Sequence, residues 1–482
     1  MVAFAGVILA VVRTRNRRRP APAEVDQGVE SGRQSDPSPN PSGPIMTQSR
    51  GSPTPAVEGA RWSSPIDGSS LSELMAMLVM LGDAMVDSND PVTHVRDSLE
   101  KVARANGLLA AEIIVLPTAL IITLPGLDEA RTEVASTGAA RLRLDQIEAV
   151  FTVVDAAESG GMGPREAAAA LQSARDQPAA FGPGVIVAGH AVIAVGLAVI
   201  LAGGWTEVGV AAILGAGVGA IKQWAASRRL AIQVFLPVAC AFLVAAAVAL
   251  LGRFEIDTAT LPPILGALVT FIPGGLLTTA VIELATGQMI SGASRFVYGG
   301  LQLVLLSLGI VGGLQLVGIP AVTVTDSGTT LAGAIAPWIG VLVFGVGVML
   351  SYSARPDSLG WILLVLYVAF AGQVVGGLLF GASLSAFVGA AVMTPVAVFV
   401  ATRPTGPPTM VTFLPAFWLL VPGAIALVGV TQVMSEARFD GLSSILGAGV
   451  TIVSIALGVV LGLSIGEWVT RIARRPSTRR TQ

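Results

Sequence analysis

The fold of this chain is decided by the stretch Phe271-Ile-Pro-Gly-Gly-Leu-Leu-Thr-Thr-Ala-Val-Ile-Glu-Leu-Ala-Thr-Gly-Gln-Met-Ile-Ser-Gly-Ala-Ser-Arg295. A continuous helix from Asp257 to Arg295 would be about 57 Å long at about 1.5 Å per residue, whereas a bilayer core is about 30 Å thick. Proline removes an intrahelical hydrogen bond, and glycine permits unusual backbone dihedrals. The sequence therefore predicts a membrane helix broken at Pro273-Gly274-Gly275, which leaves backbone carbonyls and amides free for a ligand.

Composition places the chain among polytopic membrane proteins. Of its 482 residues, 53% are hydrophobic and only 12% are charged, which is incompatible with a water-soluble globule. The formal net charge of -2 gives no indication of nucleic-acid binding. One cysteine, Cys240, excludes an intrachain disulfide, and the separated His94 and His190 cannot form a zinc motif. We expect no metal and no cofactor.

The N-terminal segment 1–69 is predicted to be disordered. Residues 20–65 are rich in Pro, Ser and Gly and offer little apolar surface to bury. Residues 1–12 are apolar but too short to span a bilayer, and the basic run 13–19 follows them, an order wrong for a secretory signal peptide. A weak anchor and a mis-set start codon both remain open as explanations of residues 1–12.

Residues 70–180 are predicted to form a small α+β domain. Asp90 is expected to be an N-cap, with Pro91 at the first helical position. The acids Asp83, Asp87 and Glu112 lack a nucleophile at suitable spacing, so we interpret them as solvated and predict no enzyme. Apolar periodicity predicts four helices and three strands, at 70–86, 91–107, 144–158 and 164–174, and at 111–116, 119–124 and 133–142.

Ten membrane spans are predicted beyond residue 181. Lysine and arginine are concentrated in alternate connections, and the positive-inside rule then places both termini and the α+β domain in the cytoplasm, with the spans in the cell (inner) membrane. The basic connections carry Lys222, Arg228, Arg229, Arg295, Arg355 and Arg403 and lead to a basic tail at 471–482, against Arg253 and Arg438 on the other side. The spans are 184–202, 207–221, 230–252, 260–291, 296–318, 332–351, 358–373, 374–401, 411–430 and 441–466.

The ten spans are predicted to form two halves, 181–320 and 330–470. A shift of 149 residues aligns Pro273-Gly274 with Pro422-Gly423 and gives 11 identities over the 41 positions 273–313. Five spans per half is an odd number, so the halves should have opposite orientations, as in an inverted-topology repeat.

The broken helices of the two halves define the candidate substrate site. A half-helix N-terminus attracts a carboxylate and freed carbonyls attract an ammonium group, a combination that suits an α-amino acid. The predicted substrate-binding residues are Pro273, Gly274, Gly275, Thr278, Thr279, Pro422, Gly423 and Gln432.

Glu283 is the predicted proton-coupling residue. In a continuous helix it would lie about 18 Å from Arg295, near the bilayer midplane, where an ionisable group is functional by default. The alternatives are that Glu283 faces a hydrated cytoplasmic vestibule or bonds Thr279 one turn earlier. His190 is interpreted as an interhelical hydrogen-bonding residue rather than a proton relay, and Gln302 as a residue that helps the helices pack.

Several motifs resemble the threonine/serine exporter family. In the α+β domain they are Met80-Leu-Gly-Asp-Ala-Met-Val-Asp-Ser88, Val95-Arg-Asp-Ser-Leu-Glu-Lys-Val-Ala-Arg-Ala-Asn-Gly-Leu108 and Val115-Leu-Pro-Thr118. In the membrane halves they are Pro273-Gly274 through Arg295 and Phe413-Leu-Pro-Ala-Phe-Trp-Leu-Leu-Val-Pro-Gly423. The resemblance covers about residues 70–470 and implies ten spans and export of threonine and serine, driven by the proton motive force.

The sequence thus predicts a mainly α-helical secondary exporter of small amino acids that works by proton antiport and alternating access. Its expected partners are the amino acid, protons and the lipid bilayer, with a homo-oligomer left open. The alternatives are a passive channel, a carrier for another small polar metabolite, or a membrane-tethered hydrolase, for which the sequence contains no catalytic constellation.

Overall fold

A computed structural model of the chain describes residues 68–125, 130–138, 141–226, 228, 230–254, 261–318, 333–420, 427–428, 430–431 and 440–473. The predicted disordered segment therefore lies outside the described residues, except for Gly68 and Ser69, which begin the first helix. The basic tail also lies outside them beyond residue 473.

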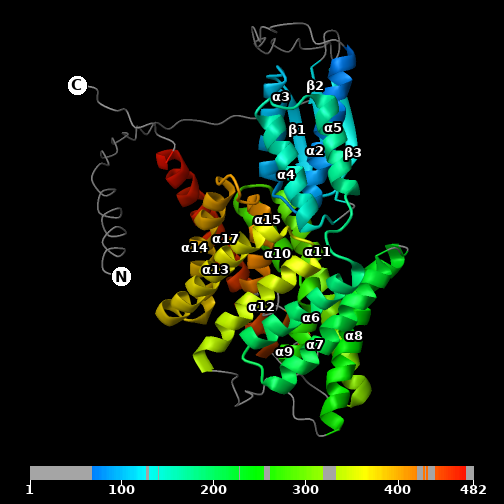
Figure 1. Ribbon diagram of the computed structural model, residues 1–482, viewed down its shortest axis with the longest axis vertical. Coiled ribbons are helices and arrows are strands. Elements are labelled where there is room, and N and C mark those ends of the chain that lie inside the picture. The colour runs from blue at the N-terminus through cyan, green and yellow to red at the C-terminus, as the bar shows by residue number, and fades with distance from the viewer. Residues whose placement is uncertain are drawn as a thin grey trace, which may run out of the picture. The chain divides into compact units, whose positions relative to one another are not determined.

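The N-terminal part, 68–176, combines four helices with a three-stranded antiparallel sheet of order β1-β2-β3 (Figure 1). Every second residue of β2 is buried, which is the pattern of a strand with one face on a core. The predicted elements are confirmed in kind, but β3 begins and ends earlier than 133–142, because its register uses the full length of β2. The elements are α2 (Gly68–Asp87), α3 (Val92–Ala105), β1 (Glu112–Leu116), β2 (Ala119–Leu124), β3 (Arg131–Ser136), α4 (Leu144–Glu158) and α5 (Pro164–Asp176).

The rest of the described chain is helical and apolar. Seven described helices are long and apolar enough to cross a bilayer, and a bent pair makes eight; two further apolar helices, α12 and α15, are shorter. The protein is therefore a polytopic membrane protein. Its helices include α6 (Pro183–Ile200), α7 (Trp205–Ala225), α8 (Leu230–Arg253), α11 (Met289–Val317), α12 (Ala336–Ser351), α13 (Leu359–Phe380), α14 (Ala382–Ala401), α15 (Thr409–Leu420) and α17 (Asp440–Ala473).

The predicted break at Pro273 is confirmed. Helix α9 (Leu261–Leu268) and the 3-10 turn η1 (Val269–Phe271) end there, and α10 (Gly274–Ala285) continues at an angle of 60°. A second interruption follows α10, where Gly287 has a φ of 85°, a left-handed conformation that glycine adopts without strain. The stretch 271–295 is thus two helices joined by a turn, so the expected 18 Å between Glu283 and Arg295 is wrong.

The boundary between the seventh and eighth predicted spans is also corrected. The chain leaves helix α13 at Gly381, whose φ is 80°, rather than near residue 374. Gly376 and Gly377 lie inside α13, where Gly376 allows close packing against Ser385 and Val388 of α14. Small residues in membrane helices more often permit close approach than end a helix.

Candidate functional site

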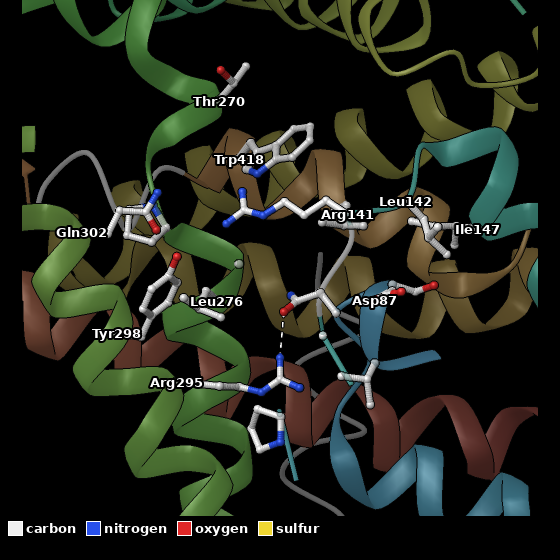
Figure 2. A pocket seen from close by; sticks show the side chains of 18 of the residues that line it. Asp87, Arg141, Leu142, Ile147, Thr270, Leu276, Arg295, Tyr298, Gln302 and Trp418 are labelled. Carbon is white, nitrogen blue, oxygen red and sulfur yellow. Dashed lines mark hydrogen bonds between the residues drawn. The ribbon is translucent and has the colours of Figure 1, made fainter. Parts of the chain in front are cut away.

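A cavity of about 450 Å³ lies beside the Pro273 break (Figure 2). This volume falls within the range of about 300–1,000 Å³ that is typical of small-molecule sites. Its wall combines the break with α11, with the ends of α12 and α15, and with the N-terminal α+β part. The lining includes Ser88, Asn89, Arg141, Thr270, Phe271, Ile272, Pro273, Gly275, Leu276, Ser294, Arg295, Tyr298, Gln302, Tyr352, Leu414 and Trp418.

Gln302 stabilises the break from the neighbouring helix α11. Its side-chain Nε2 donates a hydrogen bond to the carbonyl oxygen of Phe271 at 2.8 Å. Phe271 ends η1, so its carbonyl lacks the partner that a continuing helix would supply. Gln302 Oε1 is buried and has no hydrogen-bond partner among the described residues. The sequence interpretation of Gln302 as a helix-packing residue thus missed its role at the break.

Glu283 joins the broken helix to the N-terminal part. Its carboxylate is fully buried, accepts the backbone N–H of Val92 through Oε1 at 3.1 Å, and places Oε2 3.3 Å from Arg295 Nε. Val92 is the first residue of α3, and the structure assigns the N-cap position to Pro91, which provides no capping side chain. The expected N-cap Asp90 is therefore wrong: Glu283 supplies the acceptor from 191 positions away.

Arg295 also contacts the N-terminal part, through the loop between α2 and α3. Its Nη1 donates to Asn89 Oδ1 at 2.8 Å and its Nη2 to the carbonyl of Asp90 at 3.3 Å. Arg295 is buried, whereas the sequence placed it in a basic connection. The alternative that Glu283 bonds Thr279 is not what the structure shows, since Glu283 contacts Val92 and Arg295.

The other predicted site residues divide into three groups. Pro273 and Gly275 line the cavity. Gly274, Thr278 and Thr279 are buried in α10 without lining it, and the Thr278 hydroxyl donates to the carbonyl of Gly274 at 2.9 Å. The remaining three, in the second half, lie outside the described residues, namely Pro422, Gly423 and Gln432.

Arg141 is a cavity residue that sequence reasoning missed. Its side chain extends into the cavity toward Trp418 and Gln302 (Figure 2). It follows the β-sheet in a polar segment, where a sequence gives no sign that the membrane part lies next to it. Only the tertiary fold brings this guanidinium to the helix break.

A second missed group surrounds Lys222, which the sequence counted as a loop cation. Lys222 lies in the last turn of α7, with Nζ 3.0 Å from His190 Nε2, and the other ring nitrogen of His190 bonds Ser351. Its ammonium also lies 5.3 Å from the ring centre of Phe271, close enough for a cation–π contact. A half-buried cation therefore lies next to Phe271 at the break.

Comparison with known proteins identifies the family. The ThrE family model, described as a threonine/serine exporter, matches residues 76–317, half of the chain. The chain belongs to the threonine/serine exporter family. A relative named "Threonine/serine exporter" from Corynebacterium glutamicum is 24% identical over 434 residues, covering 85% of each chain. No solved structure matches the chain.

Membership of the threonine/serine exporter family confirms the resemblance and places the chain in a family of transporters. The matched residues contain the Pro273 break, the Glu283–Arg295 pair, Gln302 and Arg141. The part of the chain that identifies the family is thus also the part that builds most of the cavity wall.

Proposed function

We propose that this protein exports threonine, serine or similar small amino acids from the cytoplasm by proton antiport. The observation that carries the proposal is the cavity at the Pro273 break, within the residues that match the exporter family. Secondary transporters bind substrates where broken membrane helices leave backbone groups free. Here Pro273 and Gly275 contact the substrate, while Gly274, Thr278 and Thr279 shape α10 behind them.

The second wall of the substrate site comes from the other membrane half. Pro422, Gly423 and Gln432 are the repeat partners of Pro273, Gly274 and Glu283. Helix α15, which leads toward them, already contributes Leu414 and Trp418 to the cavity. In this mechanism the two halves, 181–320 and 330–470, rock about the substrate and expose it alternately to each side.

Close glycine contacts support the five-plus-five inverted repeat. In the first half, Gly309 and Gly313 of α11 lie against the carbonyl oxygens of Val238 and Phe242 in α8. Shifted by 149 residues, Gly458 and Gly462 of α17 lie against the carbonyl oxygens of Phe387 and Ala391 in α14. The same four positions thus make the same two contacts in each half.

Helices α6 and α12, the first of each half, provide a test of orientation. Gly196 packs against Phe344. Gly189, two helical turns earlier in α6, packs against Ser351, which lies two turns later in α12. The two helices therefore run antiparallel, which is expected when two equivalent halves have opposite orientations. With α12 and α15 counted as spans, the described helices account for ten crossings.

The N-terminal α+β domain, 70–180, is proposed to be cytoplasmic, with both termini on that side of the inner membrane. It contacts the membrane part at predicted cytoplasmic connections: Leu144 N–H donates to the carbonyl of Tyr352 at 3.1 Å, and Arg355 lies 3.6 Å from Glu148. These contacts support a position of the domain on the side that carries most of the basic residues.

Glu283 is proposed to couple proton movement to transport. An ionised Glu283 pairs with Arg295 and accepts the Val92 N–H. Protonation removes the charge that faces Arg295, so it weakens the link between the broken helix and the α2–α3 loop. Proton binding would thereby alter the wall of the cavity.

Transport of labelled threonine into proteoliposomes with an imposed pH gradient tests the proposal. We expect accumulation that depends on the gradient in the wild type, and loss of this dependence in Glu283→Gln. Wild-type flux that does not depend on the pH gradient would instead favour the passive channel or carrier. Full gradient-driven accumulation by Glu283→Gln would remove this residue from the coupling mechanism.

A further inference from the structure

We propose that Arg141, from the N-terminal α+β domain, binds the carboxylate of the transported amino acid. The proposal rests on the proposed function and makes the domain a part of the substrate site rather than an accessory to it. The guanidinium of Arg141 extends into the cavity and faces the wall that contains Gln302 and Trp418 (Figure 2).

The charges around the cavity indicate which charge a bound ligand group should carry. Three lining residues carry charge, and two of them have partners of opposite sign. Asp87 Oδ2 accepts a hydrogen bond from Arg175 at 3.2 Å, and Arg295 pairs with Glu283. Within the described part of the chain, no acceptor bonds the Arg141 guanidinium and no carboxylate pairs with it. The uncompensated charge in the cavity is therefore positive.

A carboxylate is the ligand group that fits this charge best. Arginine presents two parallel N–H donors that match the two oxygens of a carboxylate, and such charge-assisted bonds are about twice as strong as neutral ones. Lys222, whose Nζ lies 5.3 Å from the ring centre of Phe271, adds a second positive charge near the break. The first turn of α10, which includes the lining residues Gly275 and Leu276, contributes the positive end of a helix dipole.

The ammonium group of the substrate needs a hydrogen-bond acceptor, and helix α11 provides one. Gln302 Oε1 is a buried acceptor without a hydrogen-bond partner in the described structure, and the Gln302 side chain is fixed by its bond to Phe271. An amino acid with its carboxylate on Arg141 can thus direct its ammonium toward α11. The ligand then bridges the N-terminal domain and the broken helix.

The experiment measures how strongly the site prefers a carboxylate. Purified full-length protein in detergent is bound to labelled threonine, which is displaced by unlabelled threonine or by threonine amide, the analogue that lacks the carboxylate. We expect the wild type to prefer threonine over the amide by about 10- to 100-fold, the range for a charged hydrogen bond. In Arg141→Gln this ratio should fall to within about threefold, with affinity for the amide unchanged.

Two further variants complete the test. Arg141→Lys keeps the charge without the paired donors and should give an intermediate ratio. Arg131→Gln removes an exposed arginine of β3, outside the cavity, and should keep the wild-type ratio. Wild-type protein that binds threonine while Arg141→Gln and Arg141→Lys keep the full preference would overturn the assignment of Arg141 alone. Wild-type protein that binds neither compound would overturn the proposed function and this assignment with it.

Discussion

Glu283 and Arg295 lie 12 positions apart in sequence, yet Oε2 of one is 3.3 Å from Nε of the other. The turn at Gly287 between α10 and α11 makes this contact geometrically possible. Both side chains then reach the junction of α2 and α3, since Glu283 accepts from Val92 at the start of α3 and Arg295 donates to Asn89 in the preceding loop. The pair therefore joins the broken membrane helix to the N-terminal part, which also lines the cavity.

Removing one member of this buried pair should destabilise the protein. Glu283→Gln leaves the Arg295 charge without its partner, and breaking a buried ion pair in this way costs about 3–5 kcal/mol. The double variant Glu283→Gln/Arg295→Gln leaves no unpaired charge, so it should recover most of that loss. Denaturant unfolding in detergent measures both free energies.

The control for this pair is Glu100→Gln on the exposed face of α3. Within the described part of the chain, the ion pairs of Glu100 are with Arg96 and Arg104, whose side chains are 41% and 53% exposed. The change in stability is expected to be within about 0.5 kcal/mol. A double variant no more stable than Glu283→Gln would contradict the view that the unpaired Arg295 charge causes the loss.

Local signals explain what could be predicted from this sequence. Long apolar runs locate the membrane helices, and the Pro273-Gly274 pair favours a break because proline removes a helical hydrogen bond and glycine relaxes the backbone. The Val92–Glu283 bond follows no such rule, because it joins residues 191 positions apart. For the same reason Asp90 looked like the cap of α3, although the buried acceptor comes from α10.

Arg141 and Lys222 illustrate the same limit within the site. By sequence, Arg141 lies in the predicted strand 133–142 and Lys222 directly follows the predicted span 207–221. Cations in such positions are usually solvated. Their meaning depends on what the tertiary fold places around them: the cavity around Arg141, and His190 with the Phe271 ring around Lys222. A single sequence contains the residues but not these distances.

Gln302→Leu should weaken the break. Without the amide, the carbonyl of Phe271 loses its donor in a buried site, at a cost of about 1–3 kcal/mol. The thermal unfolding temperature and the rate of threonine transport should both fall. Gln315→Leu, on an exposed position of the same helix α11, should change neither by a measurable amount. Equal effects of the two substitutions would show that Gln302 acts through helix packing alone.

His94 should give the protein a pH-dependent stability above neutral pH. The Asp90 carboxylate, 2.7 Å from Nδ1, raises the pKa of His94 from 6.5 to about 9, with burial acting in the opposite direction. Because the folded pKa exceeds the unfolded one, this stabilisation is complete below about pH 6.5 and is lost as pH rises through about 9. The imidazole is 53% exposed, so solvent limits the effect to less than about 1 kcal/mol.

His94→Asn provides the comparison for this pH effect. The variant should unfold at a lower temperature than the wild type at pH 6, and the difference should shrink toward pH 10 as wild-type His94 loses its proton. A difference that stays constant from pH 6 to pH 10 would mean that packing against Phe151, and not the charge, stabilises this contact.

The repeat predicts matched effects of glycine substitutions in the two halves. A Cβ on Gly313 would lie 2.3 Å from the carbonyl oxygen of Phe242, and one on Gly462 would lie 2.5 Å from Thr394 Cβ. Alanine at either position should separate the helix pairs α8–α11 and α14–α17 and lower the free energy of unfolding by about 1–3 kcal/mol. Denaturant unfolding of Gly313→Ala and Gly462→Ala measures the two losses.

The controls for these substitutions are also related by the 149-residue shift. Gly300 and Gly449 have no atom within 4 Å of an added Cβ. Gly300→Ala and Gly449→Ala should therefore leave stability unchanged or raise it slightly, since alanine reduces the freedom of the unfolded chain. Because the repeat requires equivalent packing in both halves, a large loss for Gly313→Ala with none for Gly462→Ala would argue against it.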